Sequence, residues 1–231
     1  MTRTTNARIA GFTFLFYFAA GVTNMVLTAR ATGGATIAAK LASIGQHALQ
    51  LRLTIVLCLL ESVCAIVLAA TLYAITRNQD RDLALLAMIF RVAEGLFVAD
   101  SVGGILRWLW LAAAGATNIP NSASVETLGA YLAQAPEGSL AAIFFAMGST
   151  LFAWLFLRGR MIPGGLAWLG IAASVLLVVV LPLQFAGLLG GAWISFLWIP
   201  MIAYEVPLGL WLMIKGVPVS TAGELRSEAK A

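Results

Sequence analysis

Three glutamates and one arginine lie inside long apolar stretches of the sequence, where an ionised side chain is costly unless it is paired or hydrated. Glu61, Arg91, Glu94 and Glu205 each fall near the middle of such a stretch. Arg91 and Glu94 are three residues apart, so they share one side of a helix. If the stretches converge, these carboxyl groups meet a single guanidinium. At least one carboxyl should then be neutral at pH 7, because burial and like charge both favour the protonated form.

A protonated carboxyl beside an arginine can donate a proton or bind a polar head group. The candidate catalytic residues are therefore Glu61, Glu94 and Glu205. The candidate substrate-binding residues are Arg91 and five polar or aromatic side chains in or near the same stretches: Asp100, Gln184, Trp198, Tyr204 and Trp211. The aromatic rings could line a pocket for an apolar ligand or stabilise a cation, although packing and membrane-interface belts are their commoner roles.

Simpler explanations of the same residues stay open at this point. Arg91 and Glu94 could form an ion pair that only ties helices together. Glu61 or Glu205 could face a different crevice and be hydrogen-bonded across helices. Asp100 could reach interfacial water near the outer surface.

The composition places these residues in a membrane rather than in a soluble protein. Of the 231 residues, 61% are hydrophobic and 10% are charged, and the mean hydropathy is +0.95. Soluble domains carry about a quarter charged residues, so this composition excludes a soluble enzyme or a nucleic-acid-binding protein. The net charge of +4 comes from basic residues spread thinly along the chain. We expect membrane lipids and a hydrophobic small molecule as partners, no nucleic acid, and no particular oligomeric state.

The residue types predict neither a metal nor a cofactor. His47 is the only histidine and lies in a loop, which argues against zinc, di-iron or haem sites with paired histidine ligands. Cys58 and Cys64 are six residues apart in one apolar run. That spacing is about 9 Å along a helix, which is beyond the separation that a disulfide tolerates. The sequence contains no glycine-rich phosphate loop and no dinucleotide-binding motif.

Six stretches are long and apolar enough to cross roughly 30 Å of hydrocarbon as helices. We therefore expect an all-α, polytopic membrane protein with one transmembrane domain over residues 1–231, in which residues 215–231 form a cytoplasmic tail. The expected spans cover approximately residues 9–28, 51–76, 83–114, 140–157, 166–189 and 193–214.

The basic residues predict how the chain is oriented in the inner (plasma) membrane. They gather at the N-terminus, in the second and fourth loops and in the tail, whereas the third and fifth loops contain none. Only the first loop, with Arg30, Lys40 and Arg52, opposes this bias. Both termini are therefore expected in the cytoplasm. The residues that carry the bias are Arg3, Arg8, Arg77, Arg81, Arg158, Arg160, Lys215, Arg226 and Lys230.

Two outer loops show helical patterns of their own. In the first loop, Ile37, Leu41, Ile44 and Ala48 recur at helical spacing. In the third loop, Ser124 is positioned to cap a short helix. The apolar side of that helix would carry Val125, Leu128, Tyr131 and Leu132. Each could be an interfacial helix over the outer mouth of the bundle, or an ordinary connector.

Prolines predict irregular backbone close to one of the glutamates. Pro200 and Pro207 flank Glu205, and Pro182 lies near Gln184. A proline removes a backbone donor and frees a carbonyl, so a kink or an unwound turn is expected around Glu205.

Several motifs resemble a known family. They are LALLA at 83–87, FRVAE at 90–94, RGRMIP at 158–163 and E-x-x-x-GLWLMIKGV at 205–217. Together with the order of apolar stretches, they resemble the bacterial integral-membrane family catalogued as domain of unknown function four-three-eight-six. The resemblance implies a six-helix membrane protein and brings no activity with it. Members of that family often have a histidine in the fourth span, where this chain has Phe144–Gly148.

Three functions fit these observations. The first is binding or transport of a lipid-like molecule or hydrophobic amine in an intramembrane cavity. In its stronger version, transport is coupled to the movement of a proton. The second is a metal-independent intramembrane enzyme, such as an isoprenoid or terpenoid cyclase or isomerase, with a neutral glutamate as general acid. The third is an accessory subunit whose mid-membrane charges pair with another protein.

Overall fold

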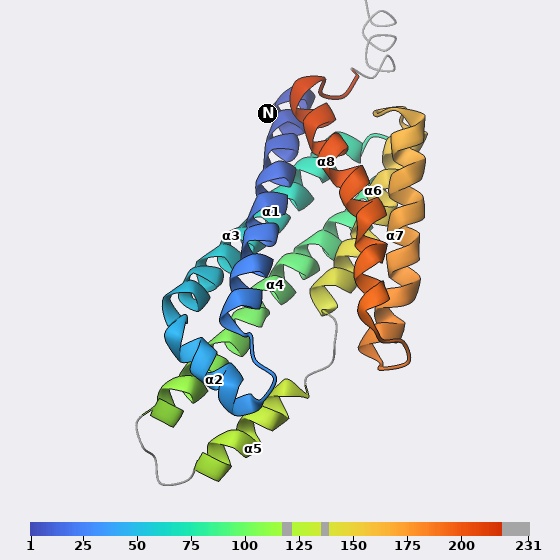
Figure 1. Cartoon of the computed structure of the whole chain (residues 1–231). Helices are drawn as coiled ribbons and strands as arrows, with labels where there is room; N and C mark the ends of the chain where they lie inside the picture. Colours follow the sequence, from blue (N-terminus) through green and yellow to red (C-terminus); the bar gives the residue numbers. More distant parts are fainter. Residues whose placement is uncertain (117–121, 135–138, 219–231) are drawn as a thin grey trace, which may run out of the picture.

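The computed structural model describes residues 1–116, 122–134 and 139–218, and these residues form helices and no strand (Figure 1). This confirms the all-α prediction. The end of the predicted tail, residues 219–231, lies outside the described residues, together with Arg226 and Lys230. The elements are α1 (Arg3–Ala31), α2 (Ile37–Gln46), α3 (Ala48–Thr76), α4 (Arg81–Ala116), α5 (Ser122–Ala133), α6 (Leu140–Arg158), α7 (Gly164–Phe185), the 3-10 helix η1 (Ala192–Trp198) and α8 (Ile199–Ile214).

Six long helices pack as a closed ring. Around the ring, α1 contacts α3, α3 contacts α4, α4 contacts α6, α6 contacts α7, α7 contacts α8, and α8 returns to α1. The interior of the ring contains most of the buried apolar side chains, such as Leu72, Phe152, Phe156 and Leu212. Large apolar side chains on the outer faces are exposed, as expected where lipid replaces water as the solvent.

The contacts of Arg3 identify which helix ends lie together, and from them the chain can be traced along the bundle six times. Its guanidinium donates hydrogen bonds to the carbonyl of Ile75 near the end of α3 and to the carbonyl of Pro218 beyond α8, and it contacts the sulfur of Met161 just after α6. The start of α1 and the ends of α3, α6 and α8 therefore lie at one end of the bundle. Since α4 and α7 begin at this same end, α1, α4 and α7 run away from it and α3, α6 and α8 return.

Five of these six passes are long and apolar enough to cross a membrane by length and composition: α1, α3, α6, α7 and η1–α8. α4 is not among the five; it carries Arg91, Glu94, Asp100 and Arg107 within its length. The path of the chain nevertheless requires α4 as a pass, because α6 could not otherwise return to the end marked by Arg3. The bundle thus has the six predicted passes, of which five meet the length and composition of a membrane span, and α4 is the polar member of the ring.

The last two passes are less regular than their apolar stretches suggest. α7 ends at Phe185, four residues before the predicted boundary, and Gly187 follows with a φ of +72° in the left-handed region that favours glycine. The last pass begins as η1 and becomes α-helical only at Ile199. Of the kink or unwound turn predicted around Glu205, the unwound turn is absent: Pro200 occupies the first turn, where it costs no hydrogen bond, and α8 continues through Pro207.

Both patterned outer loops are helical. α2 and α5 lie at the end of the bundle away from Arg3 (Figure 1). Ile44 of α2 packs in a small apolar cluster with Ala31, Leu51 and Ala112, so α2 is anchored to the ends of α1, α3 and α4. α5 begins at Ser122, so Ser124 lies inside the helix and the prediction that it caps this helix is wrong.

A glycine contact joins α1 and α8 near the end marked by Arg3. A Cβ atom at Gly11 would lie 2.4 Å from the backbone nitrogen of Met213 and 2.5 Å from the carbonyl oxygen of Gly209. This close approach of two backbones is available only to glycine. Figure 1 shows the two helices in contact near this end and separated toward the other.

Replacing Gly11 with alanine should force α1 and α8 apart and lower the free energy of unfolding by about 1–3 kcal/mol, the usual cost of overpacking. Gly21→Ala is a matched control on the same helix, since nothing lies within 4 Å of its added Cβ. Unfolding in mixed micelles measures both. Equal stabilities of the two variants would show that the glycine contact does not set the α1–α8 distance.

Candidate functional site

The centre of the ring holds a completely buried arginine. Arg91 of α4 is 0% exposed. Its Nη1 atom lies 2.7 Å from Oε2 of Glu94, one turn further along the same helix. Its Nη2 atom lies 3.9 Å from Oε1 of Glu205 on α8, which is an ion-pair distance but too long for a hydrogen bond. Two of the three predicted carboxyl groups therefore meet the guanidinium from two different helices.

Residues of α1 and α6 complete the surroundings of this ion cluster. The hydroxyl of Tyr17 donates a hydrogen bond of 2.7 Å to Oε1 of Glu94, so both oxygens of that carboxylate are engaged. The guanidinium carbon of Arg91 lies 5.4 Å from the ring centre of Phe14 and 4.9 Å from that of Phe145. Two aromatic rings thus replace part of the hydration that the cation loses on burial.

A glycine makes room for the arginine side chain. A Cβ atom at Gly148 of α6 would lie 3.1 Å from Cγ of Arg91. This part of α6 therefore accommodates the Arg91 side chain and places Phe145 against its guanidinium.

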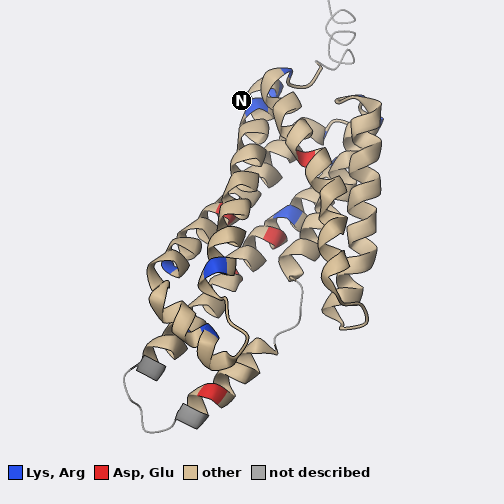
Figure 2. Cartoon of the chain, viewed as in Figure 1, with Lys and Arg blue, Asp and Glu red and all other residues tan. Residues whose placement is uncertain are grey.

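The ion cluster lies at the depth expected for the middle of a bilayer. Arg91 follows the start of α4 by ten residues and Glu205 precedes Lys215, at the end of α8, by ten residues. At a rise of about 1.5 Å per residue, both lie about 15 Å from the end of the bundle marked by Arg3. This is about half of the roughly 30 Å of hydrocarbon in a bilayer. In Figure 2, charged positions in the middle of the bundle are surrounded by uncharged ribbon.

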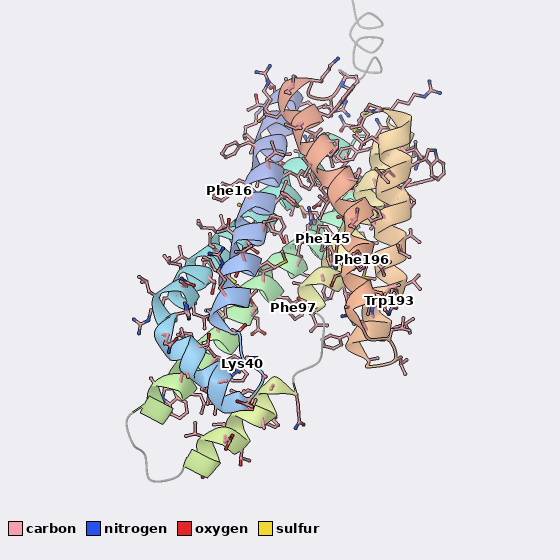
Figure 3. The ribbon with its side chains drawn as sticks, viewed as in Figure 1. Phe16, Lys40, Phe97, Phe145, Trp193 and Phe196 are labelled. Carbon is pink, nitrogen blue, oxygen red and sulfur yellow. The ribbon has the colours of Figure 1, made fainter. Side chains whose placement is uncertain are left out.

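A cavity of about 390 Å³ adjoins the cluster on the side where α1 and α8 separate. Its polar end is formed by Tyr17, Glu94 and Glu205. Its walls are almost entirely apolar and come from α1, α4, α6, η1 and α8. In the view of Figure 3, Phe145 of α6 is seen in the gap between α1 and α8. The other wall residues are Phe18, Gly21, Val22, Met25, Val98, Ala141, Ala142, Trp198, Met201 and Ile202, with Ser139 at the rim.

The order of charges from the cavity inward determines what the cavity presents. Glu94 and Glu205 line it, whereas Arg91 does not. Arg91 instead lines a void of about 10 Å³ behind the carboxyl groups, together with Ser149 and Tyr204. The cavity therefore presents hydrogen-bond acceptors at its polar end, and the guanidinium compensates their charge from behind.

Glu61 belongs to a second polar cluster and not to the one around Arg91. Its Oε1 accepts a hydrogen bond of 3.1 Å from Nδ2 of Asn24 on α1. Nδ2 of Asn24 also lies 3.1 Å from the sulfur of Cys58, and the amide oxygen of Asn24 accepts a bond from Thr28. The expectation that all three glutamates converge on one guanidinium is therefore wrong for Glu61, which points to the α1–α3 contact instead.

The remaining candidate residues lie at different places. Trp198 lines the cavity, with its ring centre 5.9 Å from that of Phe145. Tyr204 is buried behind the ion cluster and packs on Gly170. Three residues lie away from the cavity: Gln184 lines a separate hollow beside η1, Trp211 lies under the amino group of Lys215, and Asp100 is exposed on α4.

Tyr17 and Asn24 are the polar site residues that the sequence reasoning missed. Both hold a mid-membrane glutamate, and they are seven residues apart on α1, which places them on the same side of that helix. The sequence shows this spacing, and two polar residues on one side of an apolar helix could have indicated that this side faces the buried glutamates. Within the described residues, no group of three or more histidine, cysteine, aspartate or glutamate side chains is arranged to hold a metal ion.

Replacing Arg91 with methionine, which has a similar length, should lower the free energy of unfolding by about 3–5 kcal/mol, because it leaves two buried carboxyl groups without their cation. Glu94→Gln should cost less, since an amide can still pair with Tyr17. Unfolding of each variant by denaturing detergent measures the difference.

A combined variant, Arg91→Met with Glu94→Gln and Glu205→Gln, is the control for this prediction. It removes the charges together and should recover part of the stability lost in Arg91→Met alone. If the combined variant is as unstable as the sum of the separate changes, the ion cluster is not an interdependent unit.

Comparison with known proteins gives a family but no activity. No curated protein and no solved structure matches the chain. Residues 9–216 match the family described as Domain of unknown function (DUF4386), which covers all six passes of the ring. The chain is therefore a member of this family.

Proposed function

We propose that the protein binds an amphiphilic small molecule in the cavity between α1 and α8, and that it holds or transports this molecule within the membrane. The observation that carries the proposal is the composition of the cavity: apolar walls end in two carboxyl groups and a tyrosine about 15 Å below the end of the bundle. A ligand whose apolar tail packs against the walls and whose polar head contacts Glu205 would match both the apolar and the polar part of the cavity. The volume of the cavity, about 390 Å³, falls in the range of small-molecule sites.

Such a ligand would enter the cavity from the lipid bilayer. Wall residues at the rim are exposed on the outer face of the ring: Met25 is 66% exposed, Ile202 42% and Val22 40%. An apolar rim at membrane depth faces lipid. A ligand dissolved in the bilayer could therefore enter between α1 and α8 without crossing water.

The basic residues suggest which half of the bilayer the cavity faces. Arg3 and Lys215 lie at the end of the bundle where basic positions gather (Figure 2). If this end is cytoplasmic, as the positive-inside rule favours, both termini are cytoplasmic and the cavity opens toward the outer half of the inner membrane. A carboxyl that exchanges a proton for the ligand would make transport proton-coupled.

Filling the cavity should remove the ligand. Ala142 lines the wall on α6, and Ala142→Trp would occupy the space of the ligand tail. The protein is purified in a mild detergent, and mass spectrometry of its extract compares co-purifying amphiphiles. The native chain should carry a defined species, and Ala142→Trp should carry about tenfold less, the ratio that a loss of about 1.4 kcal/mol gives.

Ala70→Trp is the matched control for this experiment. Ala70 is exposed on the outer face of α3 and does not line the cavity. It adds the same side chain to a lipid-facing surface. If both variants carry as much amphiphile as the native chain, the molecules are annular lipids and the cavity does not bind them.

A further inference from the structure

We infer that the cavity selects a cationic head group, so that its ligand is a hydrophobic amine or ammonium compound rather than a fatty acid, a phosphate-bearing amphiphile or an alcohol. This inference rests on the proposed function and names the substrate class of that same site. It follows from three features of the described residues: the charge balance, the polar atoms that the cavity presents, and the aromatic rings beside them.

When both carboxyl groups of the ion cluster are ionised, the charge balance leaves one of them undercompensated. Arg91 supplies one positive charge against the carboxyl groups of Glu94 and Glu205. Glu94 takes the short ion pair, and both of its oxygens accept hydrogen bonds. Glu205 is 3.9 Å from the guanidinium, and neither its buried Oε1 nor the facing Nη2 of Arg91 has a hydrogen-bond partner, so this ion pair is weaker than that of Glu94. A ligand cation at Glu205 would supply the missing positive charge.

The polar end of the cavity is unsuited to an anion. The side chains that form it are Tyr17, Glu94 and Glu205, and the hydroxyl hydrogen of Tyr17 is directed at Glu94. Arg91 is 0% exposed and lies behind the carboxyl groups. A carboxylate or phosphate head would therefore meet carboxyl oxygens before it could reach the guanidinium, and like charges at short range in a low dielectric repel strongly.

Two aromatic rings line the same cavity as Glu205. Trp198 precedes α8 by one residue, and Phe145 packs on it from α6 with ring centres 5.9 Å apart. Indole and phenyl faces attract desolvated cations, and tryptophan is the strongest of the aromatic side chains in this respect. Carboxyl oxygens and aromatic faces together are a combination that suits an ammonium group and gives no advantage to a neutral head.

The test compares ligands that differ only in the head group. Dodecylamine, dodecanol and dodecanoate share one alkyl chain. Radiolabelled dodecylamine binds to the full chain in nanodiscs of zwitterionic lipid, and the unlabelled compounds compete. Empty nanodiscs supply the partition background. We expect dodecylamine to bind at least about tenfold more tightly than dodecanol, and dodecanoate to compete least.

Two variants assign this preference to the cavity. Glu205→Gln should reduce the preference for the amine over the alcohol to less than about threefold, whereas Glu126→Gln, which removes an exposed carboxylate of α5, should leave it unchanged. Trp198→Leu provides a second measurement should Glu205→Gln fail to fold. It should weaken amine binding more than alcohol binding.

The outcomes separate this inference from the function on which it rests. If all three compounds bind equally and Ala142→Trp abolishes their binding, the cavity is a binding site and the inference of a cationic ligand is overturned. If dodecanoate binds most tightly, the inference is likewise overturned. If Ala142→Trp changes none of the affinities, the proposed function fails first.

Discussion

The buried guanidinium of Arg91 is the constraint on which the rest of the structure depends. A cation transferred from water to a medium of low dielectric loses several kcal/mol of solvation even after the protein relaxes. Contacts from three other helices offset this loss: Phe14 from α1, Phe145 from α6 and Glu205 from α8. Glu94 on the same helix supplies the short ion pair. The ring must therefore close around this one side chain, and the charged α4 can run the length of an otherwise apolar bundle.

The cavity follows from the same arrangement combined with the glycine contact between α1 and α8. Gly11 and Gly209 bring the two backbones together near one end. Further along, Tyr17 must reach Glu94 and Glu205 must approach Arg91, so large side chains occupy the space between the helices and the backbones diverge. Beyond the ion cluster, small wall residues such as Ala142 leave the volume unfilled.

The sequence predicts how deep a side chain lies along its helix better than it predicts which neighbouring helix that side chain faces. Counting residues along an apolar stretch places Glu61, Glu94 and Glu205 at similar depths, and all three are buried in the structure. Spacing also predicts the Arg91–Glu94 pair, because three residues on one helix fix the relative direction of two side chains. Nothing in the spacing relates the direction of Glu61 on α3 to that of Arg91 on α4. Glu61 therefore pairs with Asn24, and the convergence of the other two could be recognised only once the helices were placed.

Because Arg91 lies behind the carboxyl groups, the cavity has a different charge character from the one that its residue types alone would suggest. A set of one arginine and two glutamates suggests a site of mixed character, open to anions and cations alike. In this fold the arginine contacts the carboxyl groups from the protein side, and Glu94, Glu205 and Tyr17 line the cavity whereas Arg91 does not. In the proposed function, the guanidinium lowers the cost of holding acidic groups at mid-membrane without itself contacting the ligand. Under the proposed cation selectivity, the order of the charges from the cavity inward matters more than their sum, so a buried cation can support a cation-binding cavity.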